Sequence, residues 1–166
     1  FDLVRTDRVL LHLEQPKAAV MSMLGMLKPG GLIAIADSDF GSLRFSSSLQ
    51  TQADIQVVGA IRTVYDQAIC QPRMAIDAVQ CMKDAEKGDL IEDVEIVWWT
   101  VTLDSFDDAM KLLRLEGEDG ILKDAVHRDL TTLNQSVAWE CRMRDLDLEG
   151  LFHAQFEMAL IVATRK

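Results

Sequence analysis

The segment Leu27–Phe40, LKPGGLIAIADSDF, constrains the fold of this chain more than any other part of it. Its Lys28-Pro29-Gly30-Gly31 start predicts a tight turn, because proline presets φ at the second turn position and glycine supplies a positive φ at the third. The five residues Leu32 to Ala36 then form a short continuous apolar run, which is typical of a parallel strand buried on both faces. The segment therefore predicts an α/β fold.

Three polar residues, Asp37, Ser38 and Asp39, follow this predicted strand directly. In open α/β sheets, ligands bind in the crevice outside the carboxyl ends of the strands. These residues are therefore the first candidates for a functional site. The alternative is structural, since aspartates often end a strand and cap the loop that follows.

The composition narrows the classes of partner. The chain has 166 residues, of which 49% are apolar and 27% charged, so a single domain with one core is expected. Its formal charge of -10 argues against nucleic acid or an anionic membrane surface as the main partner, because both attract clustered Lys and Arg. No apolar run approaches the roughly 20 residues that span a bilayer.

The cysteines and the acidic clusters suggest neither disulfides nor a metal site. Cys70, Cys81 and Cys141 are widely spaced and include no CxxC pair, which fits reduced thiols, and we expect a cytoplasmic protein. The acidic residues of 116–119 lack the spacing of a calcium loop, so a solvated turn is expected there. The tandem Trp98 and Trp99 must face opposite sides of a strand and are expected to fill core and sheet surface.

Apolar periodicities along the chain predict alternating strands and helices. A strand at Phe1–Val4, a helix from Pro16 to Leu27 and the strand at 32–36 predict a βαβ unit with parallel strands. The small polar residues Gly41–Ser48 predict a loop over the crevice. The other expected elements are helices at 49–71, 74–87, from 104 onward, 121–130 and 133–148, and strands at 91–103 and 155–164.

Three segments, in this order, resemble the C-terminal half of a class I S-adenosylmethionine-dependent methyltransferase of the small-molecule group that includes the quinone-biosynthesis enzymes. FDLVRTDRVLLHLEQP is similar to that family's fourth strand and following segment. MLKPGGLIAIADSDF is similar to its turn and fifth strand, and FHAQFEMALIVATRK to its closing strand hairpin. The resemblance implies a partial Rossmann-like sheet of family strands four to seven, with helices packed on it and a helical lid insertion at about 104–148, all within one domain of residues 1–166.

The resemblance also implies a reaction and a cofactor. It implies methyl transfer from S-adenosylmethionine to a small molecule, in which a methyl group must be held in line with a nucleophile, so that positioning supplies most of the rate. It places Arg5 and Thr6, with Leu10 close by, beside the methionine end of the cofactor.

On the acceptor side, the resemblance implies that Asp37, Asp39 and Phe40 line the substrate site. Asp37 is the candidate general base for an acceptor hydroxyl or amine. The loop Gly41–Ser48 and the helices of 104–148 would form a lid.

One part of the family pattern is missing from these residues. No GxGxxG-like segment occurs, so the backbone loop that would approach the cofactor is not encoded here. Two hypotheses remain open. The chain is either the acceptor-side half of a methyltransferase, inactive by itself, or a methyltransferase-derived binding or assembly module without catalysis.

The first predicted strand bears on oligomeric state. In the family the fourth strand is paired on both sides, whereas here Phe1–Val4 would be an edge strand with an unpaired ladder. We therefore expect a homodimer, or a complex with the missing N-terminal half, formed through this edge.

Overall fold

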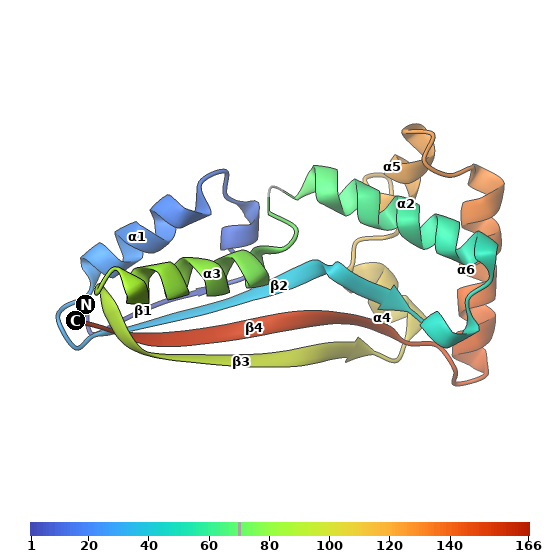
Figure 1. The fold of residues 1–166 in the computed structure, drawn as a ribbon. Coiled ribbons are helices and arrows are strands. Elements are labelled where there is room, and N and C mark those ends of the chain that lie inside the picture. Colours follow the sequence, from blue (N-terminus) through green and yellow to red (C-terminus); the bar gives the residue numbers. More distant parts are fainter. Residues whose placement is uncertain (70) are drawn as a thin grey trace. The chain divides into compact units, whose positions relative to one another are not determined.

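A computed structural model describes residues 1–69 and 71–166 of the chain, which form an α/β fold (Figure 1). The described residues contain a four-stranded mixed sheet with the strand order β1-β2-β4-β3. The elements, in chain order, are β1 (Leu3–Asp7), the 3₁₀ helix η1 (Leu10–His12), α1 (Pro16–Met26), β2 (Leu32–Phe45), the 3₁₀ helix η2 (Ser47–Leu49), α2 (Gln52–Ala68), α3 (Met74–Lys87), β3 (Ile91–Leu103), α4 (Phe106–Leu112), α5 (Ile121–His127), α6 (Leu133–Leu148) and β4 (Ala154–Arg165).

The chain divides into two compact units. The first unit comprises Phe1–Phe40, Ile69–Thr100 and Glu157–Lys166, and the second comprises Gly41–Ala68 and Val101–Phe156. Among the described residues, no helix is long and apolar enough to cross a membrane.

The predicted βαβ unit is confirmed. β1 and β2 are parallel, with a register that runs from Leu3 opposite Leu32 to Asp7 opposite Ala36. β4, the last strand of the chain, lies between β2 and β3 and runs opposite to both (Figure 1).

The turn before β2 has the predicted chemistry. The Gly31 N–H donates to the Lys28 carbonyl at 2.9 Å, and Gly30, at the third turn position, has a φ of 76°. A side chain at Gly30 would be strained in this conformation. The Gly30 N–H also donates to the carbonyl of Arg165 at 2.7 Å, so the turn is tied to the end of β4.

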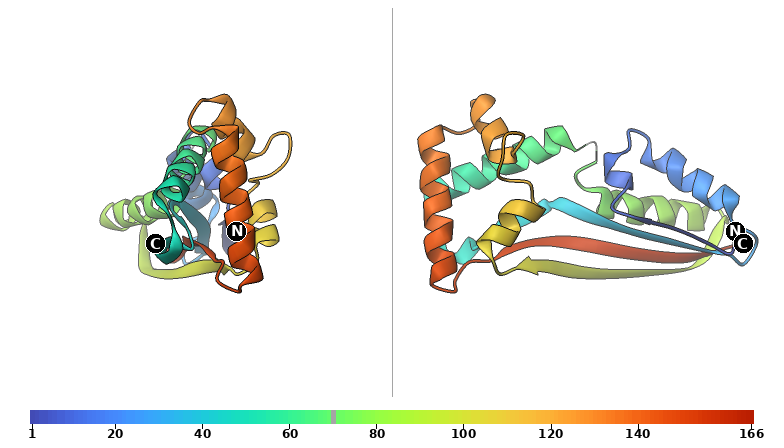
Figure 2. Two further views of the ribbon diagram at one scale, coloured as in Figure 1. Left: turned by 90° about the vertical axis from the view of Figure 1, so that its right-hand side faces the viewer. Right: turned by 180° about the vertical axis from the view of Figure 1, so that it is seen from behind.

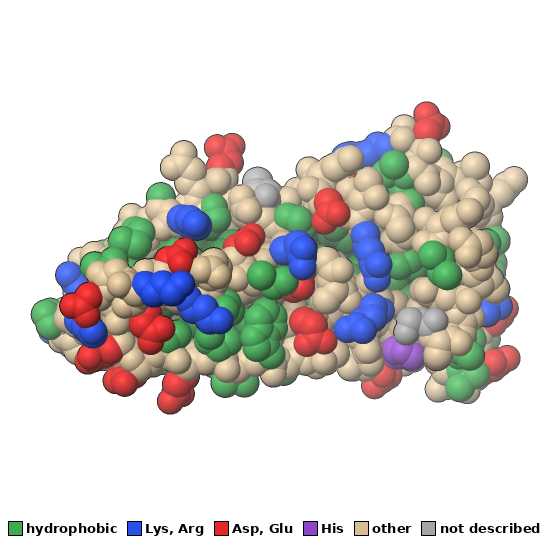
Figure 3. Space-filling model, in the orientation of Figure 1, with side chains coloured by type: hydrophobic (Ala, Val, Ile, Leu, Met, Phe, Trp, Pro, Cys, Tyr) green, Lys and Arg blue, Asp and Glu red, His purple; other side chains and the backbone are tan. Residues whose placement is uncertain are grey.

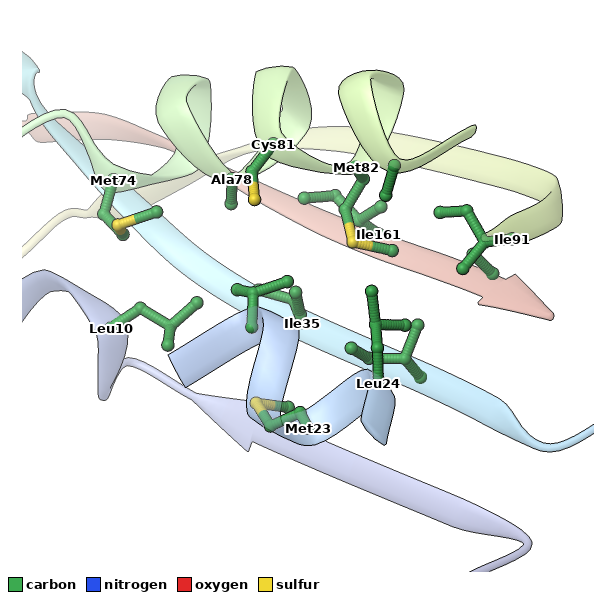
Figure 4. Close-up of a cluster of buried hydrophobic side chains, with 14 of the residues drawn as sticks. Leu10, Met23, Leu24, Ile35, Met74, Ala78, Cys81, Met82, Ile91 and Ile161 are labelled. Atoms are coloured by element: carbon green, nitrogen blue, oxygen red, sulfur yellow. The ribbon is translucent and has the colours of Figure 1, made fainter. Parts of the chain in front are cut away.

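The core of the first unit lies between its two α-helices and one face of the sheet. α1 and α3 both cover this face (Figures 1 and 2), and Leu24, Ile35, Met82 and Ile161 point toward one another between them (Figure 4). The opposite face of this unit carries no described helix of the same unit, and Leu32 there is 42% exposed. The expectation that β2 is buried on both faces is therefore wrong, because both helices pack on the same side.

The predicted end of the second strand is also wrong. β2 continues to Phe45, so Asp37–Asp39 lie inside the strand and Gly41–Ser48 is not a loop over a crevice. Leu43 and Phe45 are fully buried at a spacing of two, while Arg44 between them is exposed, which is the alternation of a strand.

The first strand is displaced from its predicted position at Phe1–Val4. β1 begins at Leu3 and extends to Asp7, because the ladder with β2 continues through the polar residues, and the Arg8 N–H donates to the Ala36 carbonyl at 2.8 Å beyond the last pair. Backbone pairing thus overrides the polarity of Arg5–Asp7.

Most helices lie close to the predicted ranges. α3, α6 and β3 have the predicted bounds. The tract predicted as one helix at 49–71 is a 3₁₀ turn followed by the shorter α2. Cys70 lies outside the described residues.

The second unit has an aromatic core. The indole of Trp139 on α6 is buried and makes edge-to-face contacts with Phe45, at a centroid distance of 5.3 Å, and with Phe106, at 6.1 Å. The buried carboxylate of Asp54 on α2 is paired with Arg142 on α6 at 2.8 Å. These contacts join α2, α4 and α6 to the end of β2.

Candidate functional site

Asp37 is the most unusual titratable residue of the first unit. It lies on β2 one residue beyond the last partner of β1, and it is fully buried. Its Oδ1 accepts the Ser38 N–H at 3.0 Å, and its Oδ2 has no hydrogen-bond partner among the described residues. A buried carboxyl with an unused oxygen is uncommon and calls for an explanation.

Burial raises the pKa of Asp37 from 3.8 to about 6. Weaker contacts with the backbone N–H groups of Ser38, Leu11 and Leu10, and the charge of His12, favour the ionised form but do not offset the loss of solvation. A carboxyl that titrates this close to neutral pH has the protonation behaviour of a general base. Because Asp37 has no exposed surface here, its role as a base stays a prediction.

Two buried hydroxyl groups near Asp37 also lack partners. Thr6 Oγ1 and Ser38 Oγ form no hydrogen bond with any described residue. Thr6 is opposite Ile35 in the β1–β2 ladder, so it shares a sheet face with Asp37, two residues further along β2. Thr6 and Asp37, predicted separately as cofactor and acceptor residues, are thus brought to the same face.

The other predicted acceptor-side residues are tied to the start of α3. The carboxylate of Asp39, almost fully buried, forms an ion pair with Arg73 Nε at 3.8 Å. The Phe40 N–H donates to the Pro72 carbonyl at 2.8 Å, and the Phe40 ring is partly buried against the core of the first unit. Arg73 was not among the predicted residues, since no local pattern relates it to Asp39.

The predicted cofactor residues do not form one surface. Arg5 is exposed and, one residue from Thr6, faces the opposite side of the sheet. Leu10 is buried in the core of the first unit. These three residues therefore do not fit S-adenosylmethionine as a joint cradle. Among residues 1–69 and 71–166, no cluster of His, Cys, Asp and Glu could hold a metal ion.

A groove of about 510 Å³ lies between α1 and α3 in the first unit. Its size suits a small molecule. Val20, Met74 and Cys81 contribute buried apolar surface. Pro16 and Ala18 also line it, together with charged and amide side chains; these are Glu14, Gln15, Lys17, Gln71, Asp77 and Gln80.

The groove is connected to Asp37 through the backbone. The N–H of Gln71, which lines the groove, donates to the carbonyl of Leu11 at 3.0 Å. The Leu11 N–H in turn contributes to holding the carboxylate of Asp37. The sequence did not reveal this groove, because periodicity shows that α1 and α3 are amphipathic but not that they lie beside each other.

The two described cysteines should differ in reactivity. Cys81 lies in the groove wall with its thiol buried, and burial raises its pKa, whereas Cys141 is exposed. At pH 7 we expect N-ethylmaleimide to alkylate Cys141 at least about tenfold faster than Cys81, since the thiolate is the reacting form. Peptide mass mapping over time measures each site, and denatured protein is the control. Equal rates in the native protein would contradict the burial of Cys81.

The sheet, with its parallel β1–β2 pair and its antiparallel final strand next to β2, belongs to an α/β fold that resembles one solved methyltransferase-like structure. The crystal structure of a candidate methyltransferase from Bacillus halodurans is similar to 99% of this chain and 69% of that one, with a TM-score of 0.51 and 14% sequence identity. At this identity the likeness shows the fold alone. No protein-family model matches the sequence, and no curated protein matches it.

Proposed function

We propose that this chain forms the acceptor-side half of an S-adenosylmethionine-dependent methyltransferase that acts on a small molecule. The observation that supports this most is the structural likeness to a candidate methyltransferase over 99% of the chain. The order of the three family-like segments points in the same direction. Since Arg5, Thr6 and Leu10 do not converge, this proposal assigns most of the cofactor site to residues other than these.

Asp37 has a positioning role in this proposal. Its buried carboxyl contacts the backbone N–H groups at the start of η1, and the carbonyl of Leu11 in η1 accepts the N–H of Gln71 beside the groove. The carboxyl thereby fixes the segment that joins β1 to α1. Such rigidity matters for methyl transfer, because the reaction depends on placement of the acceptor more than on covalent help from the protein.

A second candidate function is a binding or assembly module that keeps this part of the fold without catalysis. The observation that favours it is the divergence of the predicted cofactor residues, with Arg5 exposed and Leu10 in the core. The groove between α1 and α3 would then serve binding alone.

Isothermal titration with S-adenosylmethionine distinguishes the two. The cofactor is titrated into residues 1–166 and into the natural polypeptide in which they occur. For a methyltransferase, we expect that polypeptide to give heat of binding. Arg5→Ala should then raise the dissociation constant for S-adenosylmethionine about tenfold, which is about 1.4 kcal/mol of binding free energy. The matched control is Arg8→Ala, which removes an exposed arginine that lies directly after β1 and forms an ion pair with Asp7 at 3.0 Å. A natural polypeptide that folds but gives no heat would overturn the enzyme proposal and favour the binding module.

A further inference from the structure

The two edges of the sheet differ in how well they are protected. β1 has only five residues, and Arg5 and Asp7 place charges on it. β3 has thirteen residues, and its segment Ile96–Thr100, IVWWT, has no charge and no proline. Short length and charge are the features by which natural edge strands avoid pairing. By this criterion β1 is the better protected edge, so the middle of β3 replaces the Phe1–Val4 edge as the place where we expect two copies of the chain to pair.

The uncharged segment of β3 also carries exposed hydrophobic side chains. Val97, Trp98 and Trp99 are 55%, 44% and 38% exposed. Hydrophobic side chains gather on the visible surface along β3 (Figure 3). By contrast, the start of β3 has acidic residues and a positive φ of 52° at Asp93, which interrupts regular strand geometry. The segment open to pairing is therefore Ile96–Thr100.

We propose that β3 pairs antiparallel with β3 of a second copy of this chain, about a two-fold axis at Trp98. This arrangement places Val97 opposite the partner's Trp99 and Ile96 opposite the partner's Thr100. Pairs of an aromatic with a β-branched residue are among the stabilising cross-strand pairs. The contact is isologous, so it closes as a dimer and does not continue as a fibre.

The charge pattern selects a second copy in this orientation. Antiparallel pairing about Trp98 separates Glu95 from its copy by six residues, which is about 20 Å. Parallel pairing would place the two Glu95 carboxylates opposite each other, which is destabilising. The segment is thus complementary to itself in one direction only. The tryptophans supply the kind of residue that contributes most at interfaces.

A disulfide across the axis tests this geometry. Directly opposite residues of an antiparallel pair have Cα atoms about 4.5–5.5 Å apart, which is within disulfide range. In a Cys141→Ser background, Trp98→Cys is expected to form a covalent dimer on mild oxidation. Val97→Cys, opposite a different residue, is expected to cross-link at least about tenfold more slowly. Leu3→Cys, at a 53% exposed site on the other edge, is the matched control and should form no covalent dimer.

Sedimentation equilibrium supplies the second measurement. The unmodified chain is expected at twice its monomer mass of 18.6 kDa. Val97→Lys should raise the dissociation constant at least about tenfold, because it places a charge in the interface, whereas Leu3→Lys should not change it. Circular dichroism verifies that both variants are folded. A monomer at all concentrations, dimers disrupted only by Leu3→Lys, or a β3 that pairs only with a different protein would each overturn the proposal.

Discussion

Trp139→Ala is expected to lower the free energy of unfolding by about 3–5 kcal/mol, which is the usual cost of truncating a large buried aromatic residue. The side chain is 1% exposed and lies between Phe45 and Phe106 in edge-to-face contacts. Its removal leaves a cavity that the neighbouring rings fill only in part, and it also removes the aromatic contacts. Urea unfolding, followed by far-UV circular dichroism, measures the loss.

Two variants on α6 make this result specific. Leu148→Ala changes a residue that is 84% exposed on the same helix, and it should cost less than about 0.5 kcal/mol. Trp139→Phe should cost less than the alanine variant, because the buried Trp139 Nε1 has no hydrogen-bond partner among residues 1–69 and 71–166 and phenylalanine has no such group. Equal midpoints for the Trp139→Ala and Leu148→Ala variants would contradict the packing of Trp139.

The helices of this protein could be predicted from local patterns, and the core that they form could not. The bounds of α6 and α3 follow from apolar residues at three and four spacing, and those of β3 from its alternation, because this information lies within each segment. The contact of Trp139 with Phe45 joins residues 94 positions apart, and nothing in either segment indicates the other. Local patterns therefore predict these elements and the parallel pair of the βαβ unit, but not the contacts between the helices and the end of β2.

Strand lengths show the same distinction. Because polar residues follow Ala36, the sequence predicts that the strand ends there. In the structure, β2 continues for nine more residues to Phe45. The end of a strand is set by the neighbouring strands as well as by its own polarity. The alternation of Leu43 and Phe45 was a signal for this extension, but the small residues around them hid it.

The site residues stay predictions, but the structure shows which of them share an environment. Asp37 is predicted from its position after an apolar run, and burial raises the pKa of its carboxyl to about 6. Arg5 and Thr6 were selected together from a family motif, but side chains alternate along a strand, so neighbours cannot share one face. Arg73 and the groove beside α3 depend on tertiary contacts, which the sequence alone does not contain.

The buried carboxyl of Asp37 should make the protein less stable as the pH rises from about 4 to about 6. Its pKa is raised from 3.8 to about 6 in the folded state, so the folded protein binds the proton more tightly than the unfolded chain does. The stabilisation of the folded protein that comes from this tighter proton binding is fully present below pH 4 and is lost as the pH passes through about 6. A pKa shift of this size corresponds to a change of about 3 kcal/mol in the free energy of unfolding.

Two variants isolate this effect from the other titrating groups. Asp37→Asn resembles the neutral carboxyl, so the difference in unfolding free energy between Asp37→Asn and the unmodified protein should change by about 3 kcal/mol between pH 4 and pH 7, in favour of the variant at pH 7. Asp37→Ala removes the acceptor at Ser38 N–H and should be less stable than Asp37→Asn by about 1–3 kcal/mol at both pH values. Urea unfolding midpoints of the three proteins, measured from pH 4 to pH 7, test both expectations. A difference that stays constant with pH would mean that Asp37 is solvated in the folded protein, and the case for a buried positioning carboxyl would fail with it.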